Sequence, residues 1–172
     1  PTPDEAAALF AAMLTGLAAA HRLGFVHRDL KPGNILLELR PGRVQPRIAD
    51  FGLVKEAGST STVTGAVFGT PAYAAPEQLV DSSQTTAAAD IFSMGVIFAE
   101  LLTGRRPYAG TGLVQIYESH KQPPDLGDLV GPHRRLIEAM LHTDPTRRLP
   151  SCEAALEQLG APPEAALSTC LL

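Results

Sequence analysis

The sequence has no tryptophan, and aromatic residues make up only 5% of its 172 residues. Alanine-rich stretches at 6–8 and 87–89 supply strong helix formers instead. Hydrophobic residues reach 45% and charged residues 19%, a balance typical of a soluble globular protein and too apolar for an intrinsically disordered one. The length is that of one domain with a sizeable core.

Cysteine, basic charge and long apolar runs are also scarce. The two cysteines, Cys152 and Cys170, belong to no paired motif, so we expect a reduced, cytoplasmic protein without a disulfide framework, with Cys152 partly buried on a helix. The net charge of −4 disfavours nucleic acid as a partner. No apolar run approaches the ~18 residues that a membrane span needs, and the acidic start lacks the basic flank of a signal peptide. Because the first residue is not methionine, we expect the chain to be part of a longer protein.

The pattern of apolar residues predicts a mostly helical chain with one small β-hairpin. Thr2 and Glu5 form a capping-box pattern that opens a helix, and Gly24 ends it. Residues 87–102 are hydrophobic nearly all round, which is typical of a buried central helix. Three shorter helices are expected at about 113–120, 132–142 and 151–159.

Two short apolar segments, 35–37 and 47–49, flank the turn-forming residues 40–43 and predict the hairpin. Residues 55–70 are rich in glycine, serine and threonine and predict a long loop. Loops of this length inside a compact domain are usually functional or disordered.

One short stretch, His-Arg-Asp-Leu-Lys-Pro-Gly-Asn at 27–34, combines a carboxylate, a cationic lysine and a side-chain amide. Phosphoryl transfer needs a group that orients the attacking hydroxyl, cations for the phosphoryl oxygens and a hard oxygen ligand for Mg²⁺. Asp29, Lys31 and Asn34 supply one of each. The stretch therefore predicts phosphoryl-transfer chemistry.

A second stretch, Asp50-Phe51-Gly52, follows the second hairpin strand. The hairpin brings the loops before and after it to one edge, so we expect the Asp50 carboxylate to return to the same site. Gly52 frees the backbone just after this carboxylate.

These two stretches resemble the catalytic loop and the metal-binding loop of the protein kinase superfamily, in the order found there. Three further segments match it: 69–77 resembles the substrate-docking segment with its Ala-Pro-Glu anchor, 90–95 the start of the buried central helix, and 144–148 the late Asp-Pro-x-x-Arg motif. The resemblance runs from about residue 3 to 159. It implies a mainly α fold, the C-terminal lobe of a eukaryotic-like (Hanks-type) Ser/Thr protein kinase of bacterial type, over 1–160, with a tail or linker at 161–172.

The resemblance implies a role for each matching residue. Asp29 would accept or orient the substrate hydroxyl, and Lys31 would contact the transferred phosphate of ATP. Asn34 and Asp50 would hold Mg²⁺ or Mn²⁺. Thr70 matches the threonine of the docking segment and, with Lys31, indicates Ser/Thr specificity.

Other matching residues are expected to be structural. His27 would pack near Phe51 and hydrogen-bond backbone, and Glu77 and Arg148 would form a buried ion pair. Asp90 would brace the backbone of loop 27–34; an ordinary helix cap explains its residue type equally well. The remaining histidines are expected at the surface or at helix ends: His21, His120, His133 and His142.

The long loop carries two candidate phosphorylation sites, Thr62 and Thr64. A phosphate there adds about −1.5 to −2 charges, and Arg28 beside Asp29 is a cation that could order the loop. The alternative is a plain solvated loop.

The segments that grip ATP in this family, a Gly-rich loop, a strand lysine and a helix glutamate, do not match any part of the chain. Leu36 would form the floor of the adenine pocket. We therefore expect the N-lobe to be a missing partner, the isolated chain to be inactive, and its parent to phosphorylate protein substrates. The alternative is a non-catalytic kinase-like binding module or a truncated remnant, which would need neither Asp29 nor Asp50.

Overall fold

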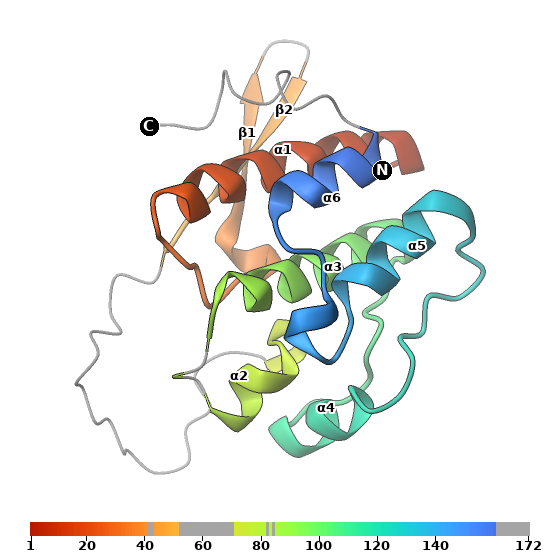
Figure 1. The fold of residues 1–172 in the computed structure, drawn as a ribbon. Helices are drawn as coiled ribbons and strands as arrows, with labels where there is room; N and C mark the ends of the chain where they lie inside the picture. The colour runs from red at the N-terminus through yellow and green to blue at the C-terminus, as the bar shows by residue number, and fades with distance from the viewer. Residues whose placement is uncertain (41–42, 52–70, 82, 84, 161–172) are drawn as a thin grey trace.

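The computed structural model describes residues 1–160 except 41–42, 52–70, 82 and 84. Within this part the fold consists of helices around one two-stranded sheet (Figure 1). Short 3₁₀ turns precede β1, α2 and α6, at Pro32–Asn34, Pro71–Tyr73 and Pro145–Arg147. The elements are α1 (Pro3–Arg22), β1 (Ile35–Arg40), β2 (Arg43–Ile48), α2 (Pro76–Val80), α3 (Ala87–Thr103), α4 (Leu113–Ser119), α5 (Gly131–Met140) and α6 (Cys152–Leu159).

Helix α3 runs through the centre of the domain, and every residue from Ala89 to Ala99 is buried. It packs against α1 and α5. Its Phe98 ring stacks on Phe10 of α1 with 4.0 Å between the ring centroids. The helix ends at Gly104, whose φ of 73° is the left-handed conformation that favours glycine after a helix. The prediction of a buried central helix is confirmed.

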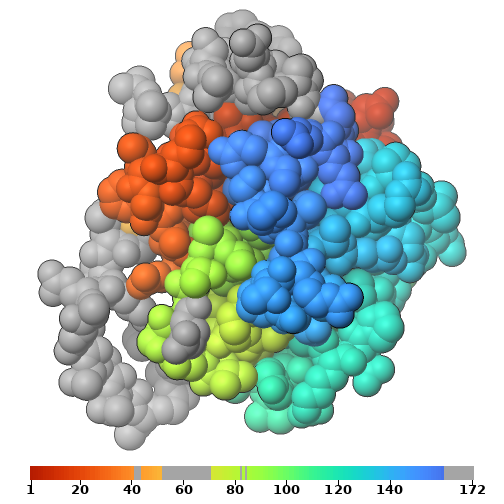
Figure 2. Space-filling model, in the orientation of Figure 1, coloured from red at the N-terminus to blue at the C-terminus, as the bar shows by residue number. Residues whose placement is uncertain are grey.

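Helix α1 begins as the sequence predicts. The Thr2 hydroxyl accepts a hydrogen bond from the Glu5 N–H at 3.3 Å, and the Glu5 carboxylate accepts one from the Thr2 N–H at 2.7 Å. This reciprocal capping satisfies two backbone donors that helix ends leave unpaired. Helix α6 lies along α1, and the two form one continuous surface in Figure 2.

The predicted hairpin is present as an antiparallel pair, with Ile35 opposite Ile48 and Leu39 opposite Val44. One further hydrogen bond, from the Ala49 N–H to the Asn34 carbonyl at 2.8 Å, continues the pairing beyond the strands. Strand β2 contacts α1. The hairpin thereby joins loop 27–34 to the segment that begins at Ala49.

The three shorter helices expected near the C-terminus correspond to α4, α5 and α6, each within two residues of the predicted bounds. The five-residue helix α2 is not predicted, since it is too short to show a helical period. Within the described part of the chain, no helix combines the length and the apolar character that a bilayer crossing requires.

His120 stands at the end of α4, as expected, and it is buried there with 2% exposure. One expectation about burial is wrong. Cys152 is not partly but fully buried, in the first turn of α6, and this burial raises the pKa of its thiol. Neither degree of burial could be inferred locally, because the contacting groups lie far along the chain; they include Phe92 for His120 and His21 for Cys152.

His120 is an unusual core residue because neither ring nitrogen has a hydrogen-bond partner among the described residues. Its ring meets those of Tyr108 and Phe92 edge-on, at centroid distances of 4.5 and 5.1 Å. The pKa of His120 is lowered from 6.5 to about 4, mainly by burial and also by the nearby charge of Arg148, while Glu77 opposes the shift. The neutral imidazole is therefore the form that the folded protein holds.

We predict that the free energy of unfolding decreases as the pH falls from 6.5 toward 4. In this window the unfolded chain binds a proton at His120 and the folded protein does not, so the full contribution, up to about 3 kcal/mol, is present only above about pH 6.5. Urea unfolding of wild type and His120→Leu at several pH values measures it. The variant should lose most of this slope, whereas His133→Gln should keep it; equal slopes for wild type and His120→Leu would contradict the assignment.

Candidate active site

Loop 27–34 is positioned by the buried carboxylate of Asp90, which is 1% exposed in the first turn of α3. Its Oδ2 accepts hydrogen bonds from the His27 N–H and from Nε2 of His21, both at 2.8 Å, and its Oδ1 accepts one from the Arg28 N–H at 2.9 Å. Three donors are what a buried carboxylate needs. The expected bracing contact is present. The alternative cap role does not apply, because the N-cap of α3 is Thr86.

His27 connects the two sides of the hairpin. Its Nε2 hydrogen-bonds the Ala49 carbonyl at 2.8 Å, and its Nδ1 accepts from the Asp29 N–H at 3.3 Å. A carbonyl can only accept, so the imidazole carries its proton on Nε2. The buried ring lies 4.8 Å from the Phe51 ring, centroid to centroid. The packing and backbone contacts expected of His27 are confirmed.

Asp29, Lys31 and Asn34 meet at one end of the loop. The Lys31 ammonium lies 2.7 Å from Asp29 Oδ2. The Asn34 side-chain NH₂ donates to the Asp29 carbonyl at 2.8 Å and to Oδ2 at 3.3 Å. Asn34 is buried, whereas the Asp29 side chain is 59% exposed. An acid, a cation and an amide thus share one solvent-accessible corner.

Asp50 adjoins this corner through the backbone of Ala49. The Ala49 N–H bonds to Asn34 and the Ala49 carbonyl to His27, so both sides of this residue are tied to loop 27–34. Asp50 follows directly, is exposed, and has a left-handed φ of 57°. Two residues of the site, Arg28 (φ 69°) and Asp50, are the only non-glycine residues with positive φ in the described chain, and such strained backbone tends to cluster at functional sites.

Among the residues the structure describes, no group of three or more histidine, cysteine, aspartate or glutamate side chains is arranged to hold a metal. The oxygen donors of Asn34 and Asp50 nevertheless suit Mg²⁺, which usually takes one or two protein ligands and completes its shell with water and substrate phosphates.

Leu36 lies on β1 and is 57% exposed. Four predicted residues lie outside the described part of the chain: Gly52, Thr62, Thr64 and Thr70.

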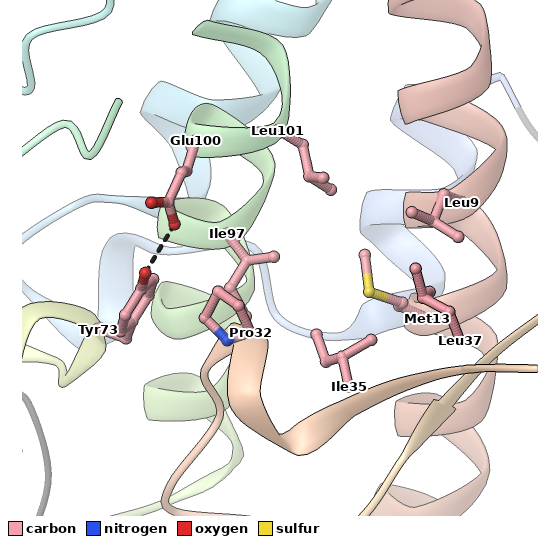
Figure 3. Close-up of a pocket in the computed structure, with 9 residues that line it drawn as sticks. All are labelled: Leu9, Met13, Pro32, Ile35, Leu37, Tyr73, Ile97, Glu100 and Leu101. Atoms are coloured by element: carbon pink, nitrogen blue, oxygen red, sulfur yellow. Dashed lines mark hydrogen bonds between the residues drawn. The ribbon is translucent and has the colours of Figure 1, made fainter. Parts of the chain in front are cut away.

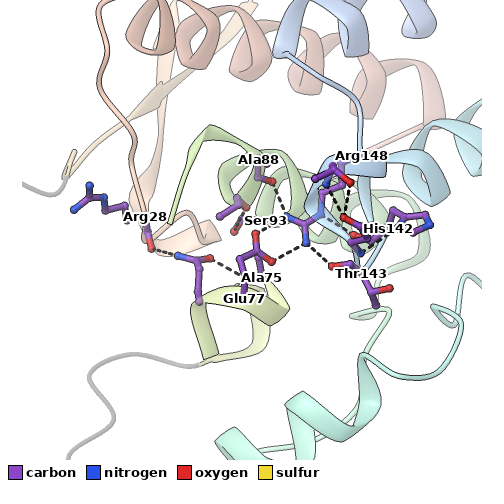
Figure 4. A network of polar contacts seen from close by, with 12 residues as sticks. Arg28, Ala75, Glu77, Ala88, Ser93, His142, Thr143 and Arg148 are labelled. Atoms are coloured by element: carbon purple, nitrogen blue, oxygen red, sulfur yellow. Dashed lines mark hydrogen bonds and ion pairs between the residues drawn. The ribbon is translucent and has the colours of Figure 1, made fainter. Parts of the chain in front are cut away.

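The predicted ion pair between Glu77 of α2 and Arg148 is present and bidentate, with N–O distances of 2.6 and 2.7 Å (Figure 4). The Arg148 side chain is fully buried. Its remaining N–H groups donate to the carbonyls of His142, Thr143 and Ala88, at 2.6 to 3.1 Å. All five guanidinium donors are therefore used, and α2 is held against α3 and the segment after α5.

A cavity of about 350 Å³, which the sequence does not predict, lies between α1, the start of β1 and α3 (Figure 3). Most of its lining is apolar, including Met13, Ile35 and Ile97. Its polar side is formed by Tyr73, whose hydroxyl donates to Glu100 at 2.7 Å. Burial and the Glu100 carboxylate raise the pKa of Tyr73. The alternation of Ile35 and Leu37 toward the cavity and Leu36 away from it is the one signal of this cavity in the sequence.

Comparison with known proteins decides the family: residues 2–159 match the protein kinase domain. The chain belongs to the protein kinase family. It is 43% identical over 137 residues to the serine/threonine-protein kinase drp72 of Corynebacterium efficiens, covering 77% of this chain and 26% of that protein. It is 39% identical over 155 residues to the serine/threonine-protein kinase PkaA of Streptomyces coelicolor, covering 88% of this chain and 28% of that one.

Solved structures of a protein kinase have a similar fold. A crystal structure of Rad53 residues 1–466 in complex with AMP-PNP superposes with a TM-score of 0.70 at 30% identity, over 92% of this chain and 40% of that one. One of the Rad53 kinase domain and SCD2 with AMPPNP gives 0.71 at 29% identity, over 91% and 58%. The chain thus spans little more than a quarter of the two bacterial relatives.

We predict that Glu77→Ala lowers the free energy of unfolding by about 3–5 kcal/mol, because it leaves the Arg148 guanidinium buried without its counter-ion. Chemical denaturation measures this. The control is Glu138→Ala, which removes the exposed pair between Glu138 and Arg134 and should cost less than about 1 kcal/mol. If both variants lost the same free energy of unfolding, the buried pair would contribute no more to stability than the exposed pair, and the prediction would be wrong.

Proposed function

We propose that the full-length protein transfers the γ-phosphate of ATP to serine or threonine hydroxyls of protein substrates. The observation that carries this proposal is the meeting of Asp29, Lys31 and Asn34 in one corner, with Asp50 tethered beside it through Ala49. A binding module without catalysis would need none of these four side chains.

Each residue has a distinct role in the proposed reaction. The exposed Asp29 carboxylate accepts a hydrogen bond from the substrate hydroxyl and orients it toward the phosphorus. Lys31, already 2.7 Å from Asp29, places a positive charge beside the point where the hydroxyl attacks and stabilises the charge on the phosphoryl oxygens. The Asn34 amide holds the backbone at Asp29, so the acid keeps its direction.

Asn34 and Asp50 are the residues that would hold Mg²⁺, or Mn²⁺ in its place. Bound there, the ion would supply positive charge to the β- and γ-phosphate oxygens of ATP. The left-handed backbone at Asp50 and the hydrogen bonds of the neighbouring Ala49 keep this carboxylate at the hairpin edge.

We further propose that the chain supplies the C-terminal lobe of the kinase, and that an N-lobe covers the hairpin. Apolar side chains on the hairpin are unusually exposed, among them Leu36 at 57% and Leu39 at 82%, as is typical of a surface that contacts another unit. Phosphoryl transfer depends on positioning both ATP and the hydroxyl, and this lobe positions only one of them. The isolated chain should therefore have no useful kinase activity.

Several predictions from the sequence remain part of this proposal. They are the docking role of Thr70, the adenine contact of Leu36, autophosphorylation at Thr62 or Thr64, and the cytoplasmic location.

We predict that Asp29→Ala and Asp50→Ala each lower the phosphotransfer rate of the full-length protein with Mg-ATP at least 100-fold. Asp29→Ala removes the group that orients the hydroxyl, and Asp50→Ala removes a ligand of the metal. Transfer of labelled phosphate to a generic serine/threonine protein substrate measures the rate. Asp128→Ala, which changes an exposed aspartate elsewhere on the domain, serves as the control. Full activity in both active-site variants would refute the assignment, and an inactive wild type would favour the binding-module alternative.

A further inference from the structure

The backbone at Arg28, just before Asp29, adopts a conformation that its own sequence does not favour. Its φ of 69° lies in the left-handed region, where a side chain crowds the following carbonyl. A residue persists there only when its surroundings fix it. Because Asp29 is the next residue, whatever fixes Arg28 also sets the direction of the Asp29 side chain.

Two side chains hold Arg28, one at each end. Asp90 accepts the hydrogen bond of the Arg28 N–H at 2.9 Å. On the other side, the side-chain NH₂ of Gln78 donates to the Arg28 carbonyl at 2.9 Å. Figure 4 shows this carbonyl facing the start of α2, close to Ala75. The peptide that joins Arg28 to Asp29 is thus held by a residue 50 positions further along the chain.

The same amide group of Gln78 also caps α2. Its Oε1 accepts a hydrogen bond from the N–H of Ala75, the N-cap residue, at 2.9 Å. The Arg28 carbonyl requires a donor and the Ala75 N–H requires an acceptor, and a side-chain amide offers both. A carboxylate, which only accepts, satisfies one of the two partners.

Helix α2 is itself anchored, because Glu77 is paired with the buried Arg148. Residues 71–77 belong to the stretch 69–77 that resembles the substrate-docking segment of kinases. The side chain of Gln78, the next residue, therefore connects this segment to loop 27–34. We infer that Gln78 is a positioning residue, which transmits the position of the docking segment to the peptide before Asp29. This inference rests on the proposed phosphotransfer.

The test is Gln78→Glu in the full-length protein. The new carboxylate has the shape of the amide and still caps Ala75, but at pH 8 it places a negatively charged oxygen against the Arg28 carbonyl. We expect kcat for phosphotransfer to fall at least tenfold, with KM for ATP within twofold of wild type.

Two further variants separate positioning from stability. Gln115→Glu is the matched control: the Gln115 Oε1 also accepts a backbone N–H, that of Thr111 at 3.1 Å, but it lies on exposed α4. It should leave kcat unchanged. Gln78→Met removes both hydrogen bonds, so kcat should fall there as well, again with KM for ATP within twofold of wild type.

Amide hydrogen exchange of residues 27–31 provides a readout that does not depend on activity. Gln78→Glu at pH 8 should exchange faster there than wild type and Gln115→Glu. Unchanged exchange, or an active wild type whose kcat survives Gln78→Glu, would overturn the inference. If wild type and Asp29→Ala are equally inactive, the proposed function fails, and the exchange result alone decides whether Gln78 holds the loop.

Discussion

The site depends on one buried carboxylate. Asp90 on the central helix accepts hydrogen bonds from the backbone of His27 and Arg28 and from the side chain of His21. A buried charge is costly unless it is fully hydrogen-bonded, so these three donors stabilise both the charge and the loop that supplies them. The irregular backbone of loop 27–34 is in this way hydrogen-bonded to the buried central helix of the domain.

Two further contacts connect this anchored loop to its neighbours. His27, held at its N–H by Asp90, reaches the Ala49 carbonyl and so ties the second motif to the first. The ion pair of Glu77 and Arg148 performs the same task for α2 on the other side of the loop. The side chains that make these contacts, His27 and Arg148, are buried with their nitrogens paired, whereas Asp29 and Asp50 are exposed. The site is therefore supported from the interior and accessible from solvent.

Much of this arrangement could be predicted from the sequence. The capping pattern of Thr2 and Glu5, the all-round apolar segment of α3 and the hairpin turn are local signals, and the kinase motifs named the residues that meet. The contacts of His120, the bridge of Gln78 and the pair of Tyr73 with Glu100 could not be predicted, because their partners lie on elements far apart in the sequence. A lone histidine or glutamine has no period or spacing that reveals what will cover it.

In the proposed reaction, the loop of Asp29 and the motif of Asp50 serve one metal-bound phosphate. The decisive experiment is a crystal structure of the full-length protein with Mg²⁺ and a non-hydrolysable ATP analogue. We expect Mg²⁺ about 2.1 Å from oxygens of Asn34 and Asp50, with the Asp29 carboxylate directed at the terminal phosphate. A metal ion bound without either residue, or a nucleotide placed away from Asp29, would contradict it.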